Sequence, residues 1–516
     1  MAGDKPPFAK LLIANRGEIA LRVIRAARSL GIRTVAVYSE IDAALPHVRF
    51  ADEAHCIGPA PAGESYLNME RILDVARRTR ADAVHPGYGF LAENAGFARA
   101  CREAGLTFVG PSAESMATMG DKIQSRRAMA AAGVPIIPGT VDPLRDPTEA
   151  AAIADQIGYP LLIKASAGGG GKGIRIVHEQ AELDRAIANA QDEARAAFGD
   201  DAVFVEKLLQ PARHIEIQLI ADDHGNIVTL GERECSIQRR RQKLIEECPS
   251  TAIGAGLRAE MEEAARNVAL ACDYRNAGTV EFLVYHDEHG DQRFAFLEMN
   301  TRLQVEHGIT ELIRDVDLVS DQIRVAAGQP LGYTSADHPI NGWAMEWRIT
   351  AEDPYTFLPG IGGVAYYREP SGPGVRVDSM LHPGMDISVH YDSLIAKLIT
   401  WGEDREQCRR RMLGALREFH IVGIATSIPF HIAMLDSPPF IDGEINTDYV
   451  EDGFSMDTGL RPETTELAAI AAAAFIRMNG ERPVPVAIQN AHNRAWGMYA
   501  RGRRSALEQG WRRNYL

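Results

Sequence analysis

The sequence predicts an α/β and α+β protein that begins with a doubly wound parallel sheet and continues into a mixed region rich in strands. Strands and helices alternate through the first 120 residues, which is typical of a parallel sheet covered by helices. A run of glycines near residue 170 separates two apolar strands, and strands dominate residues 214–306. The 516 residues are enough for about three or four domains.

The composition is that of a folded protein and excludes several classes. Hydrophobic residues make up 46% of the chain and charged residues 24%, which argues against disorder. The 70 acidic and 55 basic residues give a net charge of −15, which disfavours a nucleic-acid binder. The six cysteines include no C-x-x-C pair, so we expect reduced thiols. Because no signal segment begins the chain and its most apolar stretch, 467–476, is too short to span a bilayer, we expect a cytoplasmic protein without membrane contact.

Regular elements can be placed in order through the first 120 residues. The pattern predicts strands at 10–14, 34–39, 83–85 and 106–109 and helices at 18–30 and 71–80. Ligands of doubly wound sheets bind at the carboxyl ends of the strands. We therefore expect the polar and glycine-rich segments 15–18 and 85–90 to border a site.

The pattern changes at residue 121. A helix begins near Asp121, a compact αβ module follows at about 136–208, and one long helix at 255–272 interrupts the strands that come next. A mixed segment rich in glycine and proline leads into a last stretch of different composition. These shifts predict units at 1–120, 121–340 and 341–456 and an appended tail at 457–516.

The glycine run lies between Lys164 and Lys172 and contains four consecutive glycines, 168–171. It includes G-x-G-x-x-G, but a strand follows it where a dinucleotide-binding fingerprint requires a helix. It is not a Walker A loop either, because Gly173 occupies the position of the Ser or Thr that holds Mg²⁺. We interpret the run as a flexible lid whose amides close over phosphates, with a plain hairpin loop as the alternative.

A predicted β-hairpin carries the strongest chemical signal. Its turn is centred on His289 and Gly290, which places Glu281 opposite Glu298. Because the flanking residues are apolar on both faces, we expect the two acids to be buried. Facing acids persist in an interior only when they are paired, protonated or bound to a metal. With Asn300 on the same face, the pattern predicts a Mg²⁺ or Mn²⁺ site, and a proton-sharing acid pair is the alternative.

The polar alternation continues beyond the hairpin. If the chain stays extended, one wall carries Glu298, Asn300, Arg302, Gln304 and Glu306. Metal ligands, a planar cation, an amide and a carboxylate base on one face suit a small oxyanion beside a metal-bound phosphate. A solvated amphipathic strand is the alternative interpretation.

Taken together, these segments resemble the biotin carboxylase family, the ATP-grasp component of biotin-dependent carboxylases, over residues 8–455. The motifs that carry the resemblance are IANRGEIA (13–20), HPGYGFL (85–91), MGDK (119–122), the glycine run, RHIEIQ (213–218), EMNTRLQVEH (298–307) and AEDP (351–354). The resemblance implies a preATP-grasp domain at 1–120, an ATP-grasp domain at 121–340 with a mobile lid at about 136–208, and a mixed biotin carboxylase C-terminal domain at 341–456.

The resemblance also implies the reaction and its residues. ATP phosphorylates bicarbonate to carboxyphosphate, which carboxylates biotin on a carrier protein, for transfer to an acyl-CoA or 2-oxoacid by a carboxyltransferase. The residues implied for ATP are Lys122, Lys164, Gly170, Gly171, Glu206, His214, Gln238, Glu281 and Glu298. Those implied for two Mg²⁺ (or Mn²⁺) ions are Glu281, Glu298 and Asn300, and those for bicarbonate are Lys243, Arg302, Gln304 and Val305.

Four of the implied residues are catalytic. Glu306 is the base that deprotonates bicarbonate, Lys243 and Arg302 stabilise the anion, and Arg348 stabilises the biotin enolate, with Tyr88 near the biotin pocket. Three positions depart from the family pattern: Arg241 replaces a histidine, Trp347 a small residue, and Ser29 an acid at a bacterial dimer contact. The competing interpretations are a related ATP-grasp ligase with another carboxylate substrate and a catalytically silent subunit.

The end of the chain bears on partners. No lysine follows Lys397, so we expect biotin to be attached to a separate carrier protein. We also expect separate carboxyltransferase subunits, within a homodimer or a larger carboxylase complex. Residues 490–516 interleave six arginines with aromatic residues, which predicts subunit docking. A helix packed on its own chain and contact with RNA or a membrane are the alternatives for this tail.

Overall fold

The computed structural model describes residues 6–144, 147–165, 174–198 and 202–456. Its contacts divide the chain into two units, Met1–Met456 and Asp457–Leu516, and all described residues belong to the first. Gly170, Gly171 and the arginine-rich tail therefore lie outside the described residues. No described helix is both long and apolar enough to cross a bilayer.

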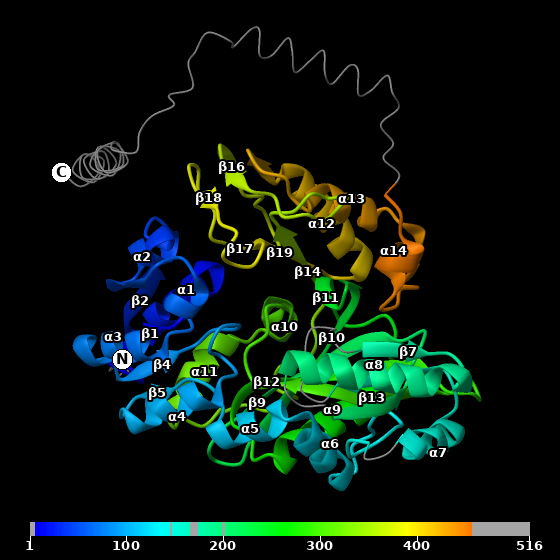
Figure 1. Ribbon diagram of the computed structural model, residues 1–516. Helices are drawn as coiled ribbons and strands as arrows, with labels where there is room; N and C mark the ends of the chain where they lie inside the picture. The colour runs from blue at the N-terminus through cyan, green and yellow to red at the C-terminus, as the bar shows by residue number, and fades with distance from the viewer. Residues whose placement is uncertain (1–5, 145–146, 166–173, 199–201, 457–516) are drawn as a thin grey trace, which may run out of the picture. The chain divides into compact units, whose positions relative to one another are not determined.

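A five-stranded parallel sheet forms the N-terminal part, as the alternating pattern predicts (Figure 1). In the order β3-β2-β1-β4-β5, its strands are β1 (Lys10–Ile13), β2 (Arg33–Ser39), β3 (Glu53–Gly58), β4 (Ala83–His85) and β5 (Thr107–Phe108). The helices around it are α1 (Gly17–Ser29), α2 (Pro46–Phe50), α3 (Met69–Thr79), α4 (Ala95–Glu103) and α5 (Ala113–Gly120), with 3₁₀ turns at Glu40–Asp42 and Ala62–Glu64. The sequence pattern did not predict β3, because this edge strand is only partly buried and Glu53 and His55 interrupt its apolar residues.

Side chains on both faces of this sheet are buried. Leu12 belongs to one hydrophobic cluster, whereas its neighbours Leu11 and Ile13 belong to another. Burial on both faces is the reason that these short strands are almost entirely apolar. The carboxyl ends of β1 and β4 lead into Asn15 and Pro86, whose hydrogen bond (2.7 Å) ties the two predicted site-bordering segments together.

An eight-stranded antiparallel sheet forms the centre of the molecule, in the order β13-β12-β9-β10-β11-β14-β19-β17. Its strands are β9 (Arg213–Ala221), β10 (Ile227–Arg239), β11 (Gln242–Cys248), β12 (Asn276–His286), β13 (Gln292–Asn300), β14 (Trp343–Thr350), β17 (Val375–Ser379) and β19 (Leu394–Gly402). The accompanying helices are α6 (Lys122–Ala131), α9 (Ala255–Ala271), α10 (His307–Arg314) and α11 (Leu318–Ala326). Because β11 pairs with β14, the central and C-terminal segments share one sheet, which places Glu246 directly opposite Glu346.

A separate three-stranded sheet lies within the predicted αβ module. Its order is β7-β6-β8, with β6 (Leu161–Ala165), β7 (Ile174–Val177) and β8 (Val203–Lys207). Two helices, α7 (Pro147–Ile157) and α8 (Gln180–Phe198), complete the module. The strands on either side of the glycine run are antiparallel neighbours, as the strand–loop–strand interpretation requires.

The C-terminal part packs helices and short strands against the end of the large sheet. Its further elements are β15 (Gly362–Gly363), β16 (Tyr366–Arg368), β18 (Asp386–Ile387), β20 (His420–Val422), α12 (Arg405–Glu418), α13 (Ile428–Leu435), α14 (Pro438–Asp442) and a π-helical turn at Tyr449–Gly453. Trp347 is fully buried here against His431 and Phe440. Because side chains alternate along a strand, Trp347 faces this core whereas Arg348 faces the other side of β14.

Candidate active site

The predicted hairpin is present, and Glu281 pairs with Glu298 across β12 and β13. The register near the turn differs by one residue from the prediction, because Tyr285 pairs with Arg293 instead of Phe294. A bulge between Glu281 and Phe282 shifts the strands back, so the two acids lie opposite each other as expected. Both side chains therefore stand on the same face of the sheet.

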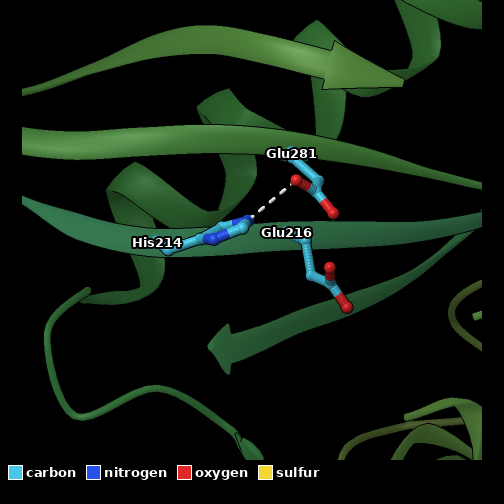
Figure 2. A group of neighbouring side chains, drawn as sticks. All are labelled: His214, Glu216 and Glu281. Carbon is cyan, nitrogen blue, oxygen red and sulfur yellow. Dashed lines mark ion pairs between the residues drawn. The ribbon is translucent and has the colours of Figure 1, made fainter. Parts of the chain in front are cut away.

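Glu281 is a buried acid with four polar partners. Its Oε1 accepts hydrogen bonds from Lys243 Nζ (2.8 Å), Asn300 Nδ2 (2.8 Å) and Gln304 Nε2 (3.2 Å). Its Oε2 lies 3.0 Å from His214 Nε2, as Figure 2 shows. Burial alone would raise the pKa of Glu281, but Lys243 and His214 hold it well below its usual range. The same contact raises the pKa of His214 against the effect of burial.

Glu298 corrects the prediction of a buried acid pair. Its side chain is exposed, because it stands near the end of edge strand β13, and it makes no hydrogen bond or ion pair with the described residues. Partial desolvation and the nearby charge of Glu281 raise its pKa. Glu281 and Glu298 with the amide oxygen of Asn300 form an all-oxygen set of the kind that Mg²⁺ and Mn²⁺ prefer. An accessible carboxylate without a protein partner fits such an ion.

A third acid, Glu216 on β9, lies opposite Glu281 on the other side of β12. It is fully buried and accepts a hydrogen bond from Arg233 Nε at 2.5 Å. Although the motif 213–218 includes it, sequence reasoning chose only His214 from that motif. The signal was available, because a Glu between Ile215 and Ile217 in a strand that is buried on both faces requires a cationic partner.

Lys243 lies at the centre of the acids. Its Nζ is 2.5 Å from Glu216 Oε2, 2.8 Å from Glu281 Oε1 and 2.8 Å from Glu306 Oε1. Burial would lower the pKa of Lys243, but these three carboxylates raise it well above its ordinary value. His214, Glu216 and Glu281 place ligand atoms within 4.8 Å of one another, as a metal site would, yet the ammonium group already neutralises the acids there.

Glu306 is completely buried between two cations. Lys243 donates to its Oε1, and Arg348 NH2 donates to its Oε2 at 2.9 Å. Burial would raise the pKa of Glu306, but Lys243 and Arg348 hold it well below its usual range. The group is therefore an ionised carboxylate that can accept a proton. Arg348 also binds Glu246 Oε1 through Nε at 2.7 Å, and Glu246 is a residue that the sequence analysis did not select.

The extended wall beyond the hairpin was a wrong prediction. Strand β13 ends at Asn300, and the chain turns through 301–306 into helix α10. The side chains still converge, because Arg302 donates to Asn300 Oδ1 (3.0 Å) and to Gln304 Oε1 (2.9 Å). Hydrogen bonds between these side chains, rather than strand alternation, hold them on one side of the site.

Arg302 also links the site to the N-terminal part of the chain. Its Nε donates to Glu93 Oε2 at 2.9 Å, and the main-chain N–H of Thr301 donates to Glu93 Oε1 at 3.0 Å. Burial would lower the pKa of Arg302, but Glu93 raises it. Glu93 follows the motif 85–91, and nothing in the sequence alone pairs it with a residue more than 200 positions away.

The residues expected at the nucleotide phosphates form a neighbouring group. Lys164 donates to Glu206, whose other oxygen accepts a hydrogen bond from Arg126 NH1 at 2.7 Å. Burial and the Lys164 ammonium lower the pKa of Lys122, and the charges of Glu298 and Glu206 also act on it. Gln238 is buried and pairs with Lys243 across β10 and β11, which places it beside the central lysine. The residues around Glu206 therefore adjoin the acids around Lys243.

Tyr88 and Val305 are linked to two further buried residues, Glu18 and Lys397. The Tyr88 hydroxyl donates to Glu18, and burial together with that carboxylate raises the pKa of Tyr88 well above its usual value. The main-chain oxygen of Val305 accepts a hydrogen bond from Lys397 Nζ at 2.7 Å. The sequence shows Lys397 as the last lysine of the chain, within an apolar strand, but does not indicate Val305 as its partner.

Arg241, Ser29 and Trp347, which depart from the family pattern, make none of the hydrogen bonds or ion pairs described above, although the charge of Arg241 acts on the pKa of Lys122. Arg241 is exposed and has a φ of 65° in the turn between β10 and β11. Ser29 is exposed at the end of α1, where its hydroxyl donates to Ala26 O. Trp347 belongs to the C-terminal core, so its size is accommodated there.

Comparisons with known proteins cover nearly the whole described chain. Family models match at residues 7–116 (biotin carboxylase, N-terminal domain), 121–334 (carbamoyl-phosphate synthase L chain, ATP binding domain) and 346–452 (biotin carboxylase C-terminal domain). Biotin carboxylase 1 of Bacillus subtilis is 52% identical over 443 residues, which are 86% of this chain and 98% of that protein. The biotin carboxylase of Haemophilus influenzae is 50% identical over 449 residues, 87% of this chain and 99% of the relative.

Solved structures agree with the sequence comparisons. The biotin carboxylase domain dimer of Hydrogenobacter thermophilus 2-oxoglutarate carboxylase, in complex with MgADP, ADP and bicarbonate, superimposes with a TM-score of 0.80 and 48% identity. The match covers 86% of this chain and 97% of that domain.

Proposed function

The chain belongs to the biotin carboxylase family, and from this premise we propose that it is the biotin carboxylase subunit of a biotin-dependent carboxylase. Such an enzyme is an ATP-dependent ligase that carboxylates biotin with bicarbonate. The observation that carries the proposal is the position of Lys243, whose Nζ lies 2.8 Å from Glu281 and 2.8 Å from Glu306. One cation thus joins the acids expected to face the nucleotide to the acid expected to act as base.

The nucleotide lies against two groups of residues in this proposal. Lys122 and Lys164 contact the phosphates, together with Gly170 and Gly171 of the glycine run, and Glu206, His214 and Gln238 contact the rest of the nucleotide. Glu281, Glu298 and Asn300 hold two Mg²⁺ or Mn²⁺ ions. When bound, such ions neutralise phosphate charge and favour attack on the terminal phosphorus.

Bicarbonate lies against Lys243, Arg302, Gln304 and the main chain of Val305. Glu306 accepts the proton of its hydroxyl group, and the freed oxygen attacks the terminal phosphorus while the bond to ADP breaks, which gives carboxyphosphate and ADP. Arg302 and Lys243 stabilise the anion during this step. The low pKa of Glu306 keeps the base ionised at neutral pH, so it is ready in each turnover.

Biotin is the second acceptor. Arg348 stabilises the enolate form of the biotin ureido group, and Tyr88 borders its pocket. Arg348 NH2 lies 2.9 Å from Glu306 Oε2, which places the expected biotin contact beside the expected base. Carboxyphosphate releases its carboxyl group to the ureido nitrogen, and the leaving phosphate takes up the proton that this nitrogen loses.

We place the preATP-grasp domain at 1–120, the ATP-grasp domain at 121–340 with its lid at about 136–208, and the C-terminal domain at 341–456. Biotin arrives on a separate carrier protein, and a separate carboxyltransferase consumes the product, within a homodimer or larger complex. The net charge of −15 supports the absence of nucleic acid among the partners. All six cysteines are free, which supports a cytoplasmic location.

The test is bicarbonate-dependent, biotin-stimulated ATP hydrolysis by the purified chain. ADP release that requires bicarbonate and rises with free biotin is the expected result. Hydrolysis that responds to a different carboxylate would assign the chain to another ATP-grasp ligase, and no hydrolysis with any of them would assign it to a silent subunit. Purifying the native complex and identifying its subunits determines the final carboxyl acceptor.

The tail at 457–516 has a separate role in this proposal, which is to dock the biotin carrier or the carboxyltransferase. Its support is compositional, because six arginines and four aromatic residues within 490–516 resemble an interface. Deleting residues 490–516 should abolish co-purification of the partner while free-biotin activity remains. Unchanged assembly would contradict docking by the tail.

A further inference from the structure

Lys397 is a fully buried lysine on β19 that the proposed reaction does not use. Its Nζ donates to the main-chain oxygen of Val305 at 2.7 Å. The neighbouring carboxylate oxygens are more distant, at 3.7 Å for Glu18, 3.7 Å for Asp378 and 3.9 Å for Glu346. Among the described contacts of the Lys397 ammonium group, only the one to the peptide oxygen of Val305 is therefore a hydrogen bond. The three acids act on the ammonium group by charge.

The partners of Lys397 come from four separate parts of the fold. Glu18 lies on α1, Glu346 on β14 and Asp378 on β17, whereas Val305 precedes α10. Neither carboxylate oxygen of Glu346 has a hydrogen-bond partner among the described residues, and one oxygen of Glu18 has none either. The three acids act on the ammonium group by charge and make no hydrogen bond to it, and Asp378 is also paired with Arg376 NH2 at 2.8 Å. The peptide oxygen of Val305 is thus the group that the ammonium orients.

The orientation of that peptide matters because it leads into Glu306. The carbonyl of Val305 and the N–H of Glu306 belong to one planar unit, so a bond that holds the oxygen also holds the start of Glu306. The carboxylate of Glu306 must meet Lys243 and Arg348 at 2.8 and 2.9 Å. A rotation of the peptide would move the base and the main chain of Val305 together.

From this geometry we infer that Lys397 is a positioning residue for the base Glu306 and for the bicarbonate contact at Val305. The inference rests on the proposed function. Lys397 does not touch substrate, because none of its side chain is accessible. The chain contains only eight lysines beside 47 arginines, and a compact ammonium group bonds to one carbonyl oxygen among three acids where a planar guanidinium would need more room.

Two variants separate positioning from charge balance. Lys397→Met removes the hydrogen bond and the cation that faces Glu18 and Glu346, while Asp378 keeps its ion pair with Arg376 (2.8 Å). It therefore also destabilises the fold. The double variant Lys397→Met/Glu346→Gln removes the ammonium group together with one of the acids that face it, and it does not restore the bond to Val305. Lys10→Met is the matched control, because Lys10 also donates to a main-chain oxygen (Thr79, 2.6 Å) and an acid (Glu53, 2.8 Å), but in the N-terminal sheet.

The measurement is bicarbonate-dependent ATP hydrolysis, with kcat and KM determined separately for bicarbonate and for ATP, beside thermal unfolding. In both Lys397 variants we expect kcat/KM for bicarbonate to fall about tenfold to a hundredfold while KM for ATP changes less than about twofold. The double variant should regain most of the thermal stability that Lys397→Met loses. Lys10→Met should leave the bicarbonate kinetics unchanged.

Three outcomes overturn the inference. A folded double variant with bicarbonate kinetics within about twofold of the wild type would show that charge balance alone matters. An equal rise of KM for ATP and for bicarbonate would show general disruption. A wild-type chain without bicarbonate-dependent hydrolysis would overturn the proposed function as well, which distinguishes the two failures. If Lys397→Met does not fold, the double variant decides.

Discussion

Two lysines lie close to Glu306, one paired with its carboxylate and one bonded to the carbonyl of Val305 before it, and their surroundings differ. Lys243 makes direct ion pairs of 2.5–2.8 Å with Glu216, Glu281 and Glu306. The acids around Lys397 lie 3.7–3.9 Å away, and its hydrogen bond goes to a main-chain oxygen. The side chain of Lys243 is 11% exposed, whereas that of Lys397 is 0% exposed.

The difference indicates how the same ammonium group serves two purposes. A cation with an accessible surface among ionised acids can contact a ligand and tune the base at the same time. A cation without any accessible surface can act only through the groups that it holds. This difference supports the proposal that Lys243 contacts substrate, whereas Lys397 acts through the main chain before Glu306.

The largest effect is expected at the acid between the two lysines. Glu306→Gln keeps the shape of the side chain but removes the proton acceptor, so bicarbonate-dependent ATP hydrolysis should fall by a factor of about 10²–10⁴. ATP binding, measured by calorimetry, should remain within about threefold, since Glu306 contacts Lys243 and Arg348 and not the expected phosphate group. Glu288→Gln on the exposed hairpin turn is the control. Turnover retained by Glu306→Gln would contradict its role as base.

The next effect compares the two lysines directly. Lys243→Met leaves Glu216, Glu281 and Glu306 without their shared cation, and the free energy of unfolding in urea should fall by about 3–5 kcal/mol. Lys397→Met should cost clearly less, because burial already raises the pKa of Glu18 and Glu346, and these acids can take up protons. An equal loss for both variants would show that the two clusters do not differ in this way.

Much of the fold around these lysines could be predicted from sequence. The alternation of strands and helices predicts the parallel sheet, and the turn residues predict the facing pair Glu281 and Glu298. The bulge that actually brings the pair into register depends on local backbone geometry, which no residue pattern specifies. Polar alternation predicted that the side chains of Arg302, Gln304 and Glu306 lie on one wall, but not that the chain turns there to begin α10.

The surroundings of Glu346 and Lys397 were harder to predict because they depend on pairing between distant segments. Glu246 and Glu346 become neighbours only when β11 pairs with β14, a contact across 100 residues. The residues that flank each acid in its own strand give no indication of its partner. Lys397 was visible as a rare lysine in an apolar strand, but Val305 as its partner follows only from the three-dimensional structure.

The third effect is a pH dependence of the free energy of unfolding that arises from Glu246. This acid binds Arg348, the partner of Glu306, and lies opposite Glu346, which faces Lys397. Burial raises the pKa of Glu246 to about 7; Arg348 opposes this shift, and the charge of Glu306 adds to it. The unfolded chain releases this proton near pH ~4.3. Between these values the folded state binds more protons than the unfolded state, so the free energy of unfolding falls as the pH rises through this window.

The measurement is urea unfolding at about pH 5 and about pH 8. Glu246→Gln cannot titrate, so the wild type should lose about 3 kcal/mol more than the variant over this range. Glu288→Gln should keep the slope of the wild type. A variant with the full wild-type slope would assign the titration to another buried acid.

The smallest expected effect tests how closely the side chains around Lys397 are packed. A methyl group on Gly308, in α10, would lie 2.4 Å from Ile399 Cδ1 and 3.3 Å from Glu346 Oε2, on the Lys397 side. Gly308→Ala should therefore lower the free energy of unfolding by about 1 kcal/mol, although alanine favours helices. Gly414→Ala, in α12, is the matched control, because its methyl group would meet no atom within 4 Å, and it should gain about 1 kcal/mol. Equal stabilisation by both substitutions would mean that α10 and β19 shift enough to accommodate the added methyl group at little cost. In that case the close fit around Lys397 would not be needed to hold Glu306.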